Sequence, residues 1–268
     1  MMKKPVFQIT QQILWRFNKV KTRYPNIVEF EVGGDYALFT DPITRVGGEK
    51  CSYPVPTYEA LKGIISSVYW KPTFIWVIDK VRIMNPIQME VKGIRNLVYT
   101  AKKKSDLANL SYYTYLKNCR YQVQAHFEWN ENRLGLAKDR NENKHHNRAK
   151  RCIERGGRRD VFLGTRECQA YVSPCNFGEG EGAYDTTPML NFGVMVHGIT
   201  YPDEVTGNLP KGEMTVRLWQ PNMENGVIEF IRPEECTMLK PIGERPIIEF
   251  SENMNNFTPI DIQEGGIN

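Results

Sequence analysis

The 268-residue sequence predicts a mixed α+β protein, with a ferredoxin-like (RRM-like) N-terminal domain and a C-terminal, mostly antiparallel β-sheet domain. A strand–helix–strand pattern opens the chain, and a long strand and a helix follow later, which is compatible with a ferredoxin-like core. From about residue 160, short alternating segments follow one another, and such a run of strands indicates antiparallel sheet. Periodicity alone leaves the topology open.

Local patterns define the N-terminal elements. Ile27–Val32 and Tyr36–Thr40 are predicted as two strands, separated by Gly33-Gly34-Asp35. Thr57 is a suitable N-cap for a helix, because apolar residues recur behind it at helical spacing until a proline ends the pattern. Phe74–Ile83 is β-branched and aromatic, which predicts the next strand.

The second half begins with Tyr121–Trp129, whose alternation of apolar and polar residues predicts a half-buried strand. A polar loop follows, and Lys144–Arg155 is predicted as a helix that ends at Gly156-Gly157. A turn at Glu224-Asn225-Gly226 is expected to join the last two strands as a hairpin. The later strands are expected at Asp160–Leu163, Glu167–Val172, Gly193–Ile199, Glu213–Trp219 and Val227–Ile231.

Charge and composition divide the chain into four parts. Residues 1–28 contain six basic residues and no acid, and are expected to form a basic N-terminal extension. Because the net charge is +4, the remainder sums to −2, so that any nucleic-acid surface has to be a local patch. We expect the ferredoxin-like domain over 29–159, the β-rich domain over 160–235 and an acidic, weakly ordered tail over 236–268.

Several functional classes find no support in the sequence. Glutamines and a threonine interrupt the apolar stretch within Met1–Phe17, so we expect no signal peptide, and no apolar run is long enough for a bilayer. The six cysteines form no C-x-x-C pair and the four histidines no H-E-x-x-H motif, which argues against a metal site. No Walker loop or dinucleotide fingerprint is present. We therefore expect a cytoplasmic protein without metal, cofactor or membrane partner.

The strongest local signal is the basic segment 144–159, which holds seven Lys or Arg residues and one acid. It is either a solvated helix face or a surface whose cations neutralise backbone phosphates. The second interpretation assigns RNA binding to His146, Arg148, Lys150, Arg151, Arg155, Arg158 and Arg159.

Lys144 and His145 open this segment and give it a chemical use. RNA is cut by its own 2′-hydroxyl when a base removes the proton, a cation stabilises the phosphate oxygens and an acid protonates the leaving oxygen. A histidine and a lysine suit these tasks without a metal, provided that they lie in a loop or at a helix start, where both can face one phosphate. His126 and His197 are expected to be core residues, and Tyr69 by itself a core-edge aromatic.

Short motifs that occur in order along the chain resemble those of one protein family. They are Gly34-Asp35-Tyr36-Ala37-Leu38-Phe39-Thr40-Asp41-Pro42, Gly47-Gly48-Glu49-Lys50, Val55-Pro56-Thr57-Tyr58, Tyr69-Trp70-Lys71-Pro72, Asp139-Arg140-Asn141-Glu142 with Lys144-His145, Gly156-Gly157-Arg158-Arg159-Asp160 and Met223-Glu224-Asn225-Gly226. Together they resemble the CRISPR-associated Cas-five family of subtype I-C, also called Dvulg, over residues 29–235.

The resemblance implies an endoribonuclease with a ferredoxin-like domain and a β-rich domain. Family members cleave precursor CRISPR RNA at the base of the repeat hairpin without a metal. They then hold the 5′ handle of the crRNA in a surveillance complex, beside its backbone and large subunits. The family's catalytic tyrosine, lysine and histidine match Tyr69, Lys144 and His145, which makes Tyr69 a candidate catalytic residue.

Alternatives stay open at this point. Other branches of the family have lost cleavage, so the alternative function is a non-catalytic subunit that binds the 5′ handle, and a metal-dependent nuclease is a third. His146 could share the role of His145, and the acid and base roles among these two residues, Tyr69 and Lys144 are not assigned. The first 28 residues have no counterpart in the resemblance. The sequence also leaves open whether duplex DNA binds.

Overall fold

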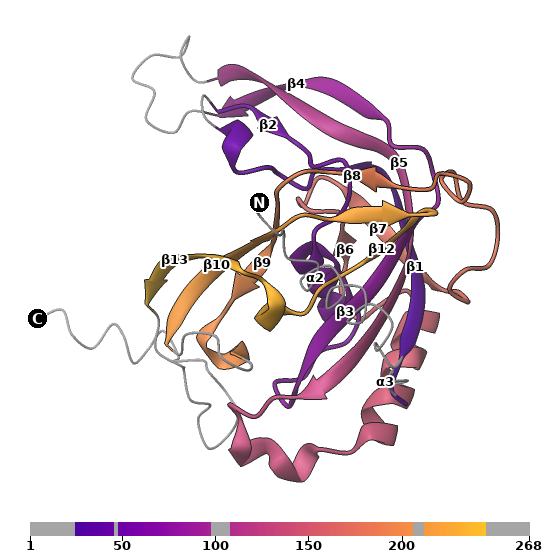
Figure 1. Cartoon of the computed structure of the whole chain (residues 1–268), viewed down its shortest axis with the longest axis vertical. Coiled ribbons are helices and arrows are strands. Elements are labelled where there is room, and N and C mark those ends of the chain that lie inside the picture. The colour runs from indigo at the N-terminus through magenta and orange to yellow at the C-terminus, as the bar shows by residue number, and fades with distance from the viewer. Residues whose placement is uncertain (1–24, 46–47, 98–107, 206–211, 245–268) are drawn as a thin grey trace, which may run out of the picture.

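The computed structural model describes residues 25–45, 48–97, 108–205 and 212–244, which form two β-sheets with helices packed against them (Figure 1). The larger sheet has ten strands, with the order β6-β7-β1-β5-β3-β12-β11-β8 and with β2 and β4 also paired to β5. The smaller sheet has the order β13-β10-β9. The predicted mixed α+β class with mostly antiparallel strands is thus confirmed.

The helices are α2 (Tyr58–Val68) and α3 (Glu142–Glu154), with short 3-10 helices at Ile43–Arg45, Leu134–Asp139, Pro202–Glu204 and Pro233–Glu235. The strands are β1 (Val28–Ala37), β2 (Lys50–Cys51), β3 (Phe74–Ile83), β4 (Met89–Leu97), β5 (Ala108–Trp129), β6 (Val161–Phe162), β7 (Gln169–Pro174), β8 (Leu190–Asn191), β9 (Met195–Thr200), β10 (Glu213–Trp219), β11 (Asn222–Glu224), β12 (Val227–Glu229) and β13 (Met238–Glu244).

The 22-residue strand β5 organises the larger sheet. Its second half lies between β1 and β3, while its first half pairs with β4 in a hairpin at the top of Figure 1. The sequence predicted only the second half, Tyr121–Trp129, as a strand. The strand begins much earlier because the residues before Tyr121 find their partner in β4, a pairing that local patterns do not reveal.

Strand β1 runs without a break through Gly33 and Gly34, although these glycines were expected to separate two strands. That prediction was wrong because the glycines serve a close approach between strands rather than a turn. A Cβ atom on Gly34 would lie 2.7 Å from the backbone oxygen of Gln169 in β7. Strand β7 therefore packs against β1 only because no side chain is present there.

Helix α2 begins where the sequence predicts it, with the Thr57 side chain accepting a hydrogen bond from the backbone N–H of Ala60. Its buried face includes Leu61, Ile65 and Val68. The helix packs against β3 of the larger sheet and β9 of the smaller one. It ends at Tyr69, whose backbone is extended.

Helix α3 is also predicted by the sequence, although it begins at Glu142 rather than at Lys144. The side chain of Asn141 caps it by accepting a hydrogen bond from the backbone N–H of Lys144. One stripe of α3 is buried, namely His145, Ala149 and Ile153, which recur every fourth residue. This stripe faces the larger sheet and places His145 among core residues.

The strands after residue 160 are divided between the two sheets: β6, β7, β8, β11 and β12 join the larger sheet, whereas β9 and β10 form the smaller sheet with β13. The predicted hairpin between Glu213–Trp219 and Val227–Ile231 is wrong, because β10 pairs with β9 and β13 while β12 pairs with β11. The turn itself is present at Asn225 and Gly226, which both have positive φ. Residues 1–24 and 245–268, and with them most of the predicted extension and tail, lie outside the described residues.

Candidate catalytic centre

Two of the three predicted catalytic residues meet in the structure. Tyr69 directly follows α2 and His145 lies in the first turn of α3, and the Tyr69 hydroxyl oxygen is 2.8 Å from His145 Nδ1. The Tyr69 backbone is held in place because its carbonyl accepts a hydrogen bond of 2.7 Å from the indole N–H of Trp76. Both rings are buried, with exposed fractions of 1% and 0%.

The second ring nitrogen of His145 fixes the tautomer. Nε2 lies 2.8 Å from the backbone carbonyl oxygen of Asp139. Because a carbonyl oxygen only accepts, Nε2 carries a proton. In the neutral ring Nδ1 is then a hydrogen-bond acceptor, so that Tyr69 donates its hydroxyl proton to Nδ1.

Aromatic side chains enclose the His145 ring. The ring centroids of Phe74, Phe127 and Trp129 lie 5.3, 6.2 and 5.9 Å from that of His145, and all three pairs are edge to face. These side chains come from β3 and from the end of β5. Both nitrogens of His145 are therefore engaged within the protein, in an apolar enclosure.

Lys144 is connected to His145 through the carboxylate of Asp139. Its ammonium forms an ion pair with Asp139 Oδ1, while the Thr73 hydroxyl donates to Oδ2 at 2.9 Å. Oδ2 also lies 3.3 Å from His145 Nε2. Burial raises the pKa of Asp139, but the hydrogen bonds from Lys144 and Thr73 outweigh it, so that the pKa ends below its ordinary value. The Lys144 side chain is 46% exposed, and of the three predicted residues it is the one open to solvent.

Asp139 and Thr73 were missed as site residues by the sequence analysis. Asp139 stood within a family motif, but no role was assigned to it. A backbone carbonyl that binds a histidine leaves no signal in the residue type. The spacing of Asp139, Asn141, Lys144 and His145 was the available clue, because the residues just before a helix cap lie beside the first turn of the helix.

Tyr69 keeps its proton at neutral pH. Burial raises the pKa of its hydroxyl above the ordinary value, and the nearby charges of Arg148 and Arg158 only partly offset this. The two guanidinium groups are exposed and Tyr69 is not. The Tyr69 hydroxyl is therefore a buried, protonated group near two surface cations.

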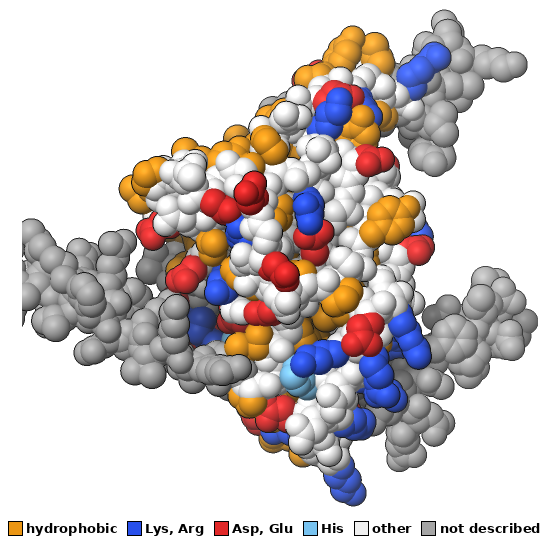
Figure 2. Space-filling model, turned by 90° about the vertical axis from the view of Figure 1, so that its right-hand side faces the viewer, with side chains coloured by type: hydrophobic (Ala, Val, Ile, Leu, Met, Phe, Trp, Pro, Cys, Tyr) orange, Lys and Arg blue, Asp and Glu red, His pale blue; other side chains and the backbone are white. Residues whose placement is uncertain are grey.

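The predicted RNA-binding residues lie mostly on the surface. Figure 2 faces the side of the molecule that carries α3, and Lys and Arg side chains gather in its lower part beside a histidine. The exposed members are Arg148, Lys150, Arg151, Arg155, Arg158 and Arg159. His146 differs from them, because it is half-buried and its Nε2 donates to the backbone oxygen of Ile27 at 2.9 Å.

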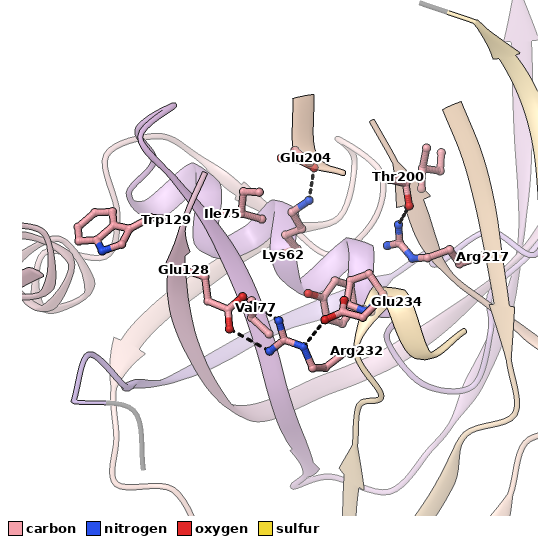
Figure 3. Close-up of a pocket in the computed structure, with 13 residues that line it drawn as sticks. Lys62, Ile75, Val77, Glu128, Trp129, Thr200, Glu204, Arg217, Arg232 and Glu234 are labelled. Carbon is pink, nitrogen blue, oxygen red and sulfur yellow. Dashed lines mark hydrogen bonds and ion pairs between the residues drawn. The ribbon is translucent and has the colours of Figure 1, made fainter. Parts of the chain in front are cut away.

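A second polar cluster lies in a cavity of about 30 Å³ between α2, the larger sheet and the smaller sheet (Figure 3). Here Lys62 pairs with Glu204, and the Arg232 guanidinium donates to both oxygens of Glu128 at 2.9 and 2.7 Å. Arg217 donates to the Thr200 hydroxyl. The cavity has room for about one water molecule, and its charges are paired with one another. These paired side chains connect the two sheets, and the cavity between them is too small for a substrate.

Within the described ranges, no group of three or more His, Cys, Asp or Glu side chains is placed to hold a metal ion. Among the helices of the described residues, none is both long and apolar enough to span a membrane.

Comparison with known sequences identifies a family. A family model described as CRISPR-associated protein (Cas_Cas5) matches residues 27–231. The chain is 37% identical over 108 residues to the CRISPR pre-crRNA endoribonuclease Cas5d of Mannheimia succiniciproducens, over 37% of this chain and 46% of that protein. It is 35% identical over 57 residues to the protein of the same name from Thermus thermophilus, over 21% and 24%. The chain therefore spans less than half of the length of either relative in these matches.

Solved structures agree with this result. A CRISPR-associated protein shares 34% identity with a TM-score of 0.66, over 80% of this chain and 96% of the other. A functionally uncharacterized protein from Streptococcus mutans shares 37% identity with a TM-score of 0.65 over the same fractions. Because the family model covers most of the sequence and the resemblance in the short motifs points the same way, the chain belongs to the Cas5d group of the CRISPR-associated Cas5 family.

Proposed function

We propose that this Cas5d-family chain is an endoribonuclease that cleaves precursor CRISPR RNA at the base of the repeat hairpin, without a metal. The observation that carries the proposal is the hydrogen bond of 2.8 Å between Tyr69 and His145, with Lys144 held beside them. The pre-crRNA endoribonuclease relatives support the substrate class. Helix α3 then contributes two of the catalytic residues, Lys144 and His145, and exposed cations that bind the RNA backbone.

The proposed reaction is an attack by the 2′-hydroxyl of the RNA on its own adjacent phosphorus. The bond between O2′ and phosphorus forms while the bond between phosphorus and O5′ breaks. The products are a 2′,3′-cyclic phosphate and a 5′-hydroxyl. One proton has to leave O2′, one has to reach O5′, and negative charge on the non-bridging oxygens has to be stabilised.

The residues at the site suit these three tasks. The Tyr69–His145 pair is a hydrogen-bonded chain of titratable groups. The Lys144 ammonium is partly exposed, so that it can reach a phosphate when RNA competes with Asp139 for it. The exposed cations of α3 and of residues 158–159 hold the flanking phosphates, which makes the affinity depend on salt.

After cleavage the protein is proposed to stay on the 5′ handle of the crRNA, as a subunit of the type I-C surveillance complex in the cytoplasm. There it lies beside the backbone and large subunits and takes part in antiviral defence. We further infer that β1-α2-β3-β5-α3-β7 is a ferredoxin-like module. The sheet order β7-β1-β5-β3 supports this, because the fourth strand borders the first and the third strand separates the first from the second.

Cleavage of a cognate repeat hairpin in excess chelator tests the activity. The expected product carries a 5′-hydroxyl, and a single 2′-deoxy substitution at the cut nucleotide is expected to block the reaction. Cleavage of the deoxy substrate would contradict the mechanism, and loss of activity in chelator would favour a metal-dependent nuclease.

A single variant distinguishes the proposed endoribonuclease from the alternative function, a non-catalytic subunit that binds the 5′ handle. His145→Gln is expected to lose cutting while it retains most of the RNA affinity, because the cations of α3 are unchanged. A wild-type protein that binds the hairpin and never cuts it would establish the alternative.

A further inference from the structure

The contacts of His145 restrict the part that it can play in the proposed cleavage. Its Nε2 donates to the backbone carbonyl of Asp139, and its Nδ1 accepts from Tyr69. The ring has an exposed fraction of 0% and is enclosed by aromatic side chains. Both nitrogens are therefore occupied while these contacts persist, so that neither is free to take a proton directly from an RNA hydroxyl.

Resting on the proposed function, we propose that His145 acts on RNA only through Tyr69, as a base relay, and that Asp139 is the positioning residue of this relay. The chain of contacts runs from the Asp139 carbonyl to Nε2–H, and from Nδ1 to the Tyr69 hydroxyl, with 2.8 Å at each step. A base that is oriented by a third group is the usual arrangement for activating a hydroxyl.

The direction of the relay follows from the tautomer. Because the unprotonated Nδ1 accepts the hydrogen bond from Tyr69, and Tyr69 holds a proton, the pair is set to accept a proton from RNA. The 2′-hydroxyl gives its proton to the Tyr69 oxygen, while the proton of Tyr69 passes to Nδ1. The electron pair left on O2′ forms the bond to phosphorus, and O5′ leaves with a proton from the Lys144 ammonium. Exchange with water then restores the imidazole and the ammonium.

Asp139 positions both ends of this chemistry. Its backbone oxygen holds the proton on Nε2, and its carboxylate lies 3.3 Å from the same nitrogen, where it stabilises the imidazolium that the relay produces. The same carboxylate pairs with Lys144 and accepts from Thr73 at 2.9 Å. One residue thus orients the base and keeps the acid beside it.

A double-mutant cycle tests the relay. Single-turnover cleavage is measured for Tyr69→Phe, His145→Gln and the double variant, with RNA affinity and melting temperature as controls of folding. Each single variant is expected to be about 100-fold to 1,000-fold slower, and the double variant within about threefold of the slower single one. A double variant slowed by the product of the two factors would overturn the relay, because the residues would then act separately. If His145→Gln does not fold, His145→Asn takes its place.

The tautomer provides a readout that needs no cleavage. In the nitrogen NMR spectrum of ¹⁵N-histidine-labelled protein, the neutral His145 ring is expected to carry its proton on Nε2 and none on Nδ1. A proton on Nδ1 would overturn the relay even if the protein cuts RNA. If the spectrum is as expected but the protein cuts no RNA, the proposed function is wrong, and the relay with it.

The role of Asp139 is tested with Asp139→Asn, which keeps the backbone oxygen and an acceptor for Thr73 but removes the charge. Its kcat is expected to fall at least about tenfold while KM changes less than about threefold. The matched control is Asp185→Asn, the same change in a carboxylate that pairs with Arg82 at 2.6 Å, and its kcat is expected to stay within about twofold. An unchanged kcat in Asp139→Asn would overturn the positioning role.

Discussion

The buried histidine of the smaller sheet predicts how the fold responds to acid. His197 has an exposed fraction of 0%, and its Nε2 donates to the backbone oxygen of Ile231 at 2.9 Å. Its Nδ1 accepts from Arg217 Nε at 3.3 Å, so that a second ring proton would point at a guanidinium. Burial, and then the charge of Arg217, lower the pKa of His197 from 6.5 to about 3.

The lowered pKa of His197 determines how the free energy of unfolding changes with pH. Between pH 6.5 and 3 the unfolded chain protonates this ring and the folded chain does not, so the contribution of His197 is complete above pH 6.5 and is lost as the pH falls. From pH 7 to pH 5 the loss amounts to about 2 kcal/mol. His126 acts in the opposite direction: burial lowers its pKa, but the hydrogen bonds with Asp79 and Glu128 outweigh burial and raise it. Its contribution is present at low pH and is lost as the pH rises.

A comparison of variants isolates the effect of His197. Urea unfolding at pH 7, 6 and 5 is followed for the wild type and His197→Gln, and the difference in the free energy of unfolding is expected to shrink by about 2 kcal/mol from pH 7 to 5. Thr200→Val is the control, because it also removes a partner of Arg217 but no titrating group. A difference that stays constant over this range would refute the reasoning, since His197 would then titrate alike in both states.

Three further predictions concern β1, α3 and the basic surface. Gly34→Ala places a Cβ 2.7 Å from the backbone oxygen of Gln169, so urea unfolding should show that the free energy of unfolding falls by about 1–3 kcal/mol. An unchanged midpoint would contradict this, because β7 would then shift to accommodate the methyl group at no cost. Asn141→Ala removes the cap of α3 and should cost about 1 kcal/mol in the same assay, with Asn141→Ser restoring most of it. Arg158→Gln should weaken RNA binding and reduce the slope of log affinity against log salt by about 0.7, whereas Arg95→Gln, an exposed change on the β4–β5 hairpin, should leave the slope unchanged.

The sequence predicted the elements that local patterns determine. Strand β3 and helix α2 lie where expected, because a β-branched run and a capped apolar repeat are sufficient signals. The first half of β5 was missed and the hairpin of β10 was wrong, because both depend on which distant segment supplies the partner strand. Propensity contains no information about that choice.

The candidate site, too, could be predicted only in part from the sequence. The resemblance brought Tyr69 to notice, whereas composition alone assigned it to the edge of the core, where its ring is indeed buried. Its contact with His145 joins residues 76 positions apart and depends on the whole sheet. The bond from His145 to the Asp139 backbone was not predictable, because a backbone oxygen is common to every residue type. The catalytic roles of Tyr69, Lys144 and His145 stay predictions.

The length of β5 has a consequence for how this family can vary. The strand carries Phe127 and Trp129 to the His145 ring at one end and pairs with β4 at the other. Inserting one residue in the strand would turn every later side chain to the opposite face and move both aromatic rings away from the histidine. Insertions and deletions among related sequences should therefore be rare between residues 108 and 129. Where they occur, they should come in pairs or be accommodated by a bulge.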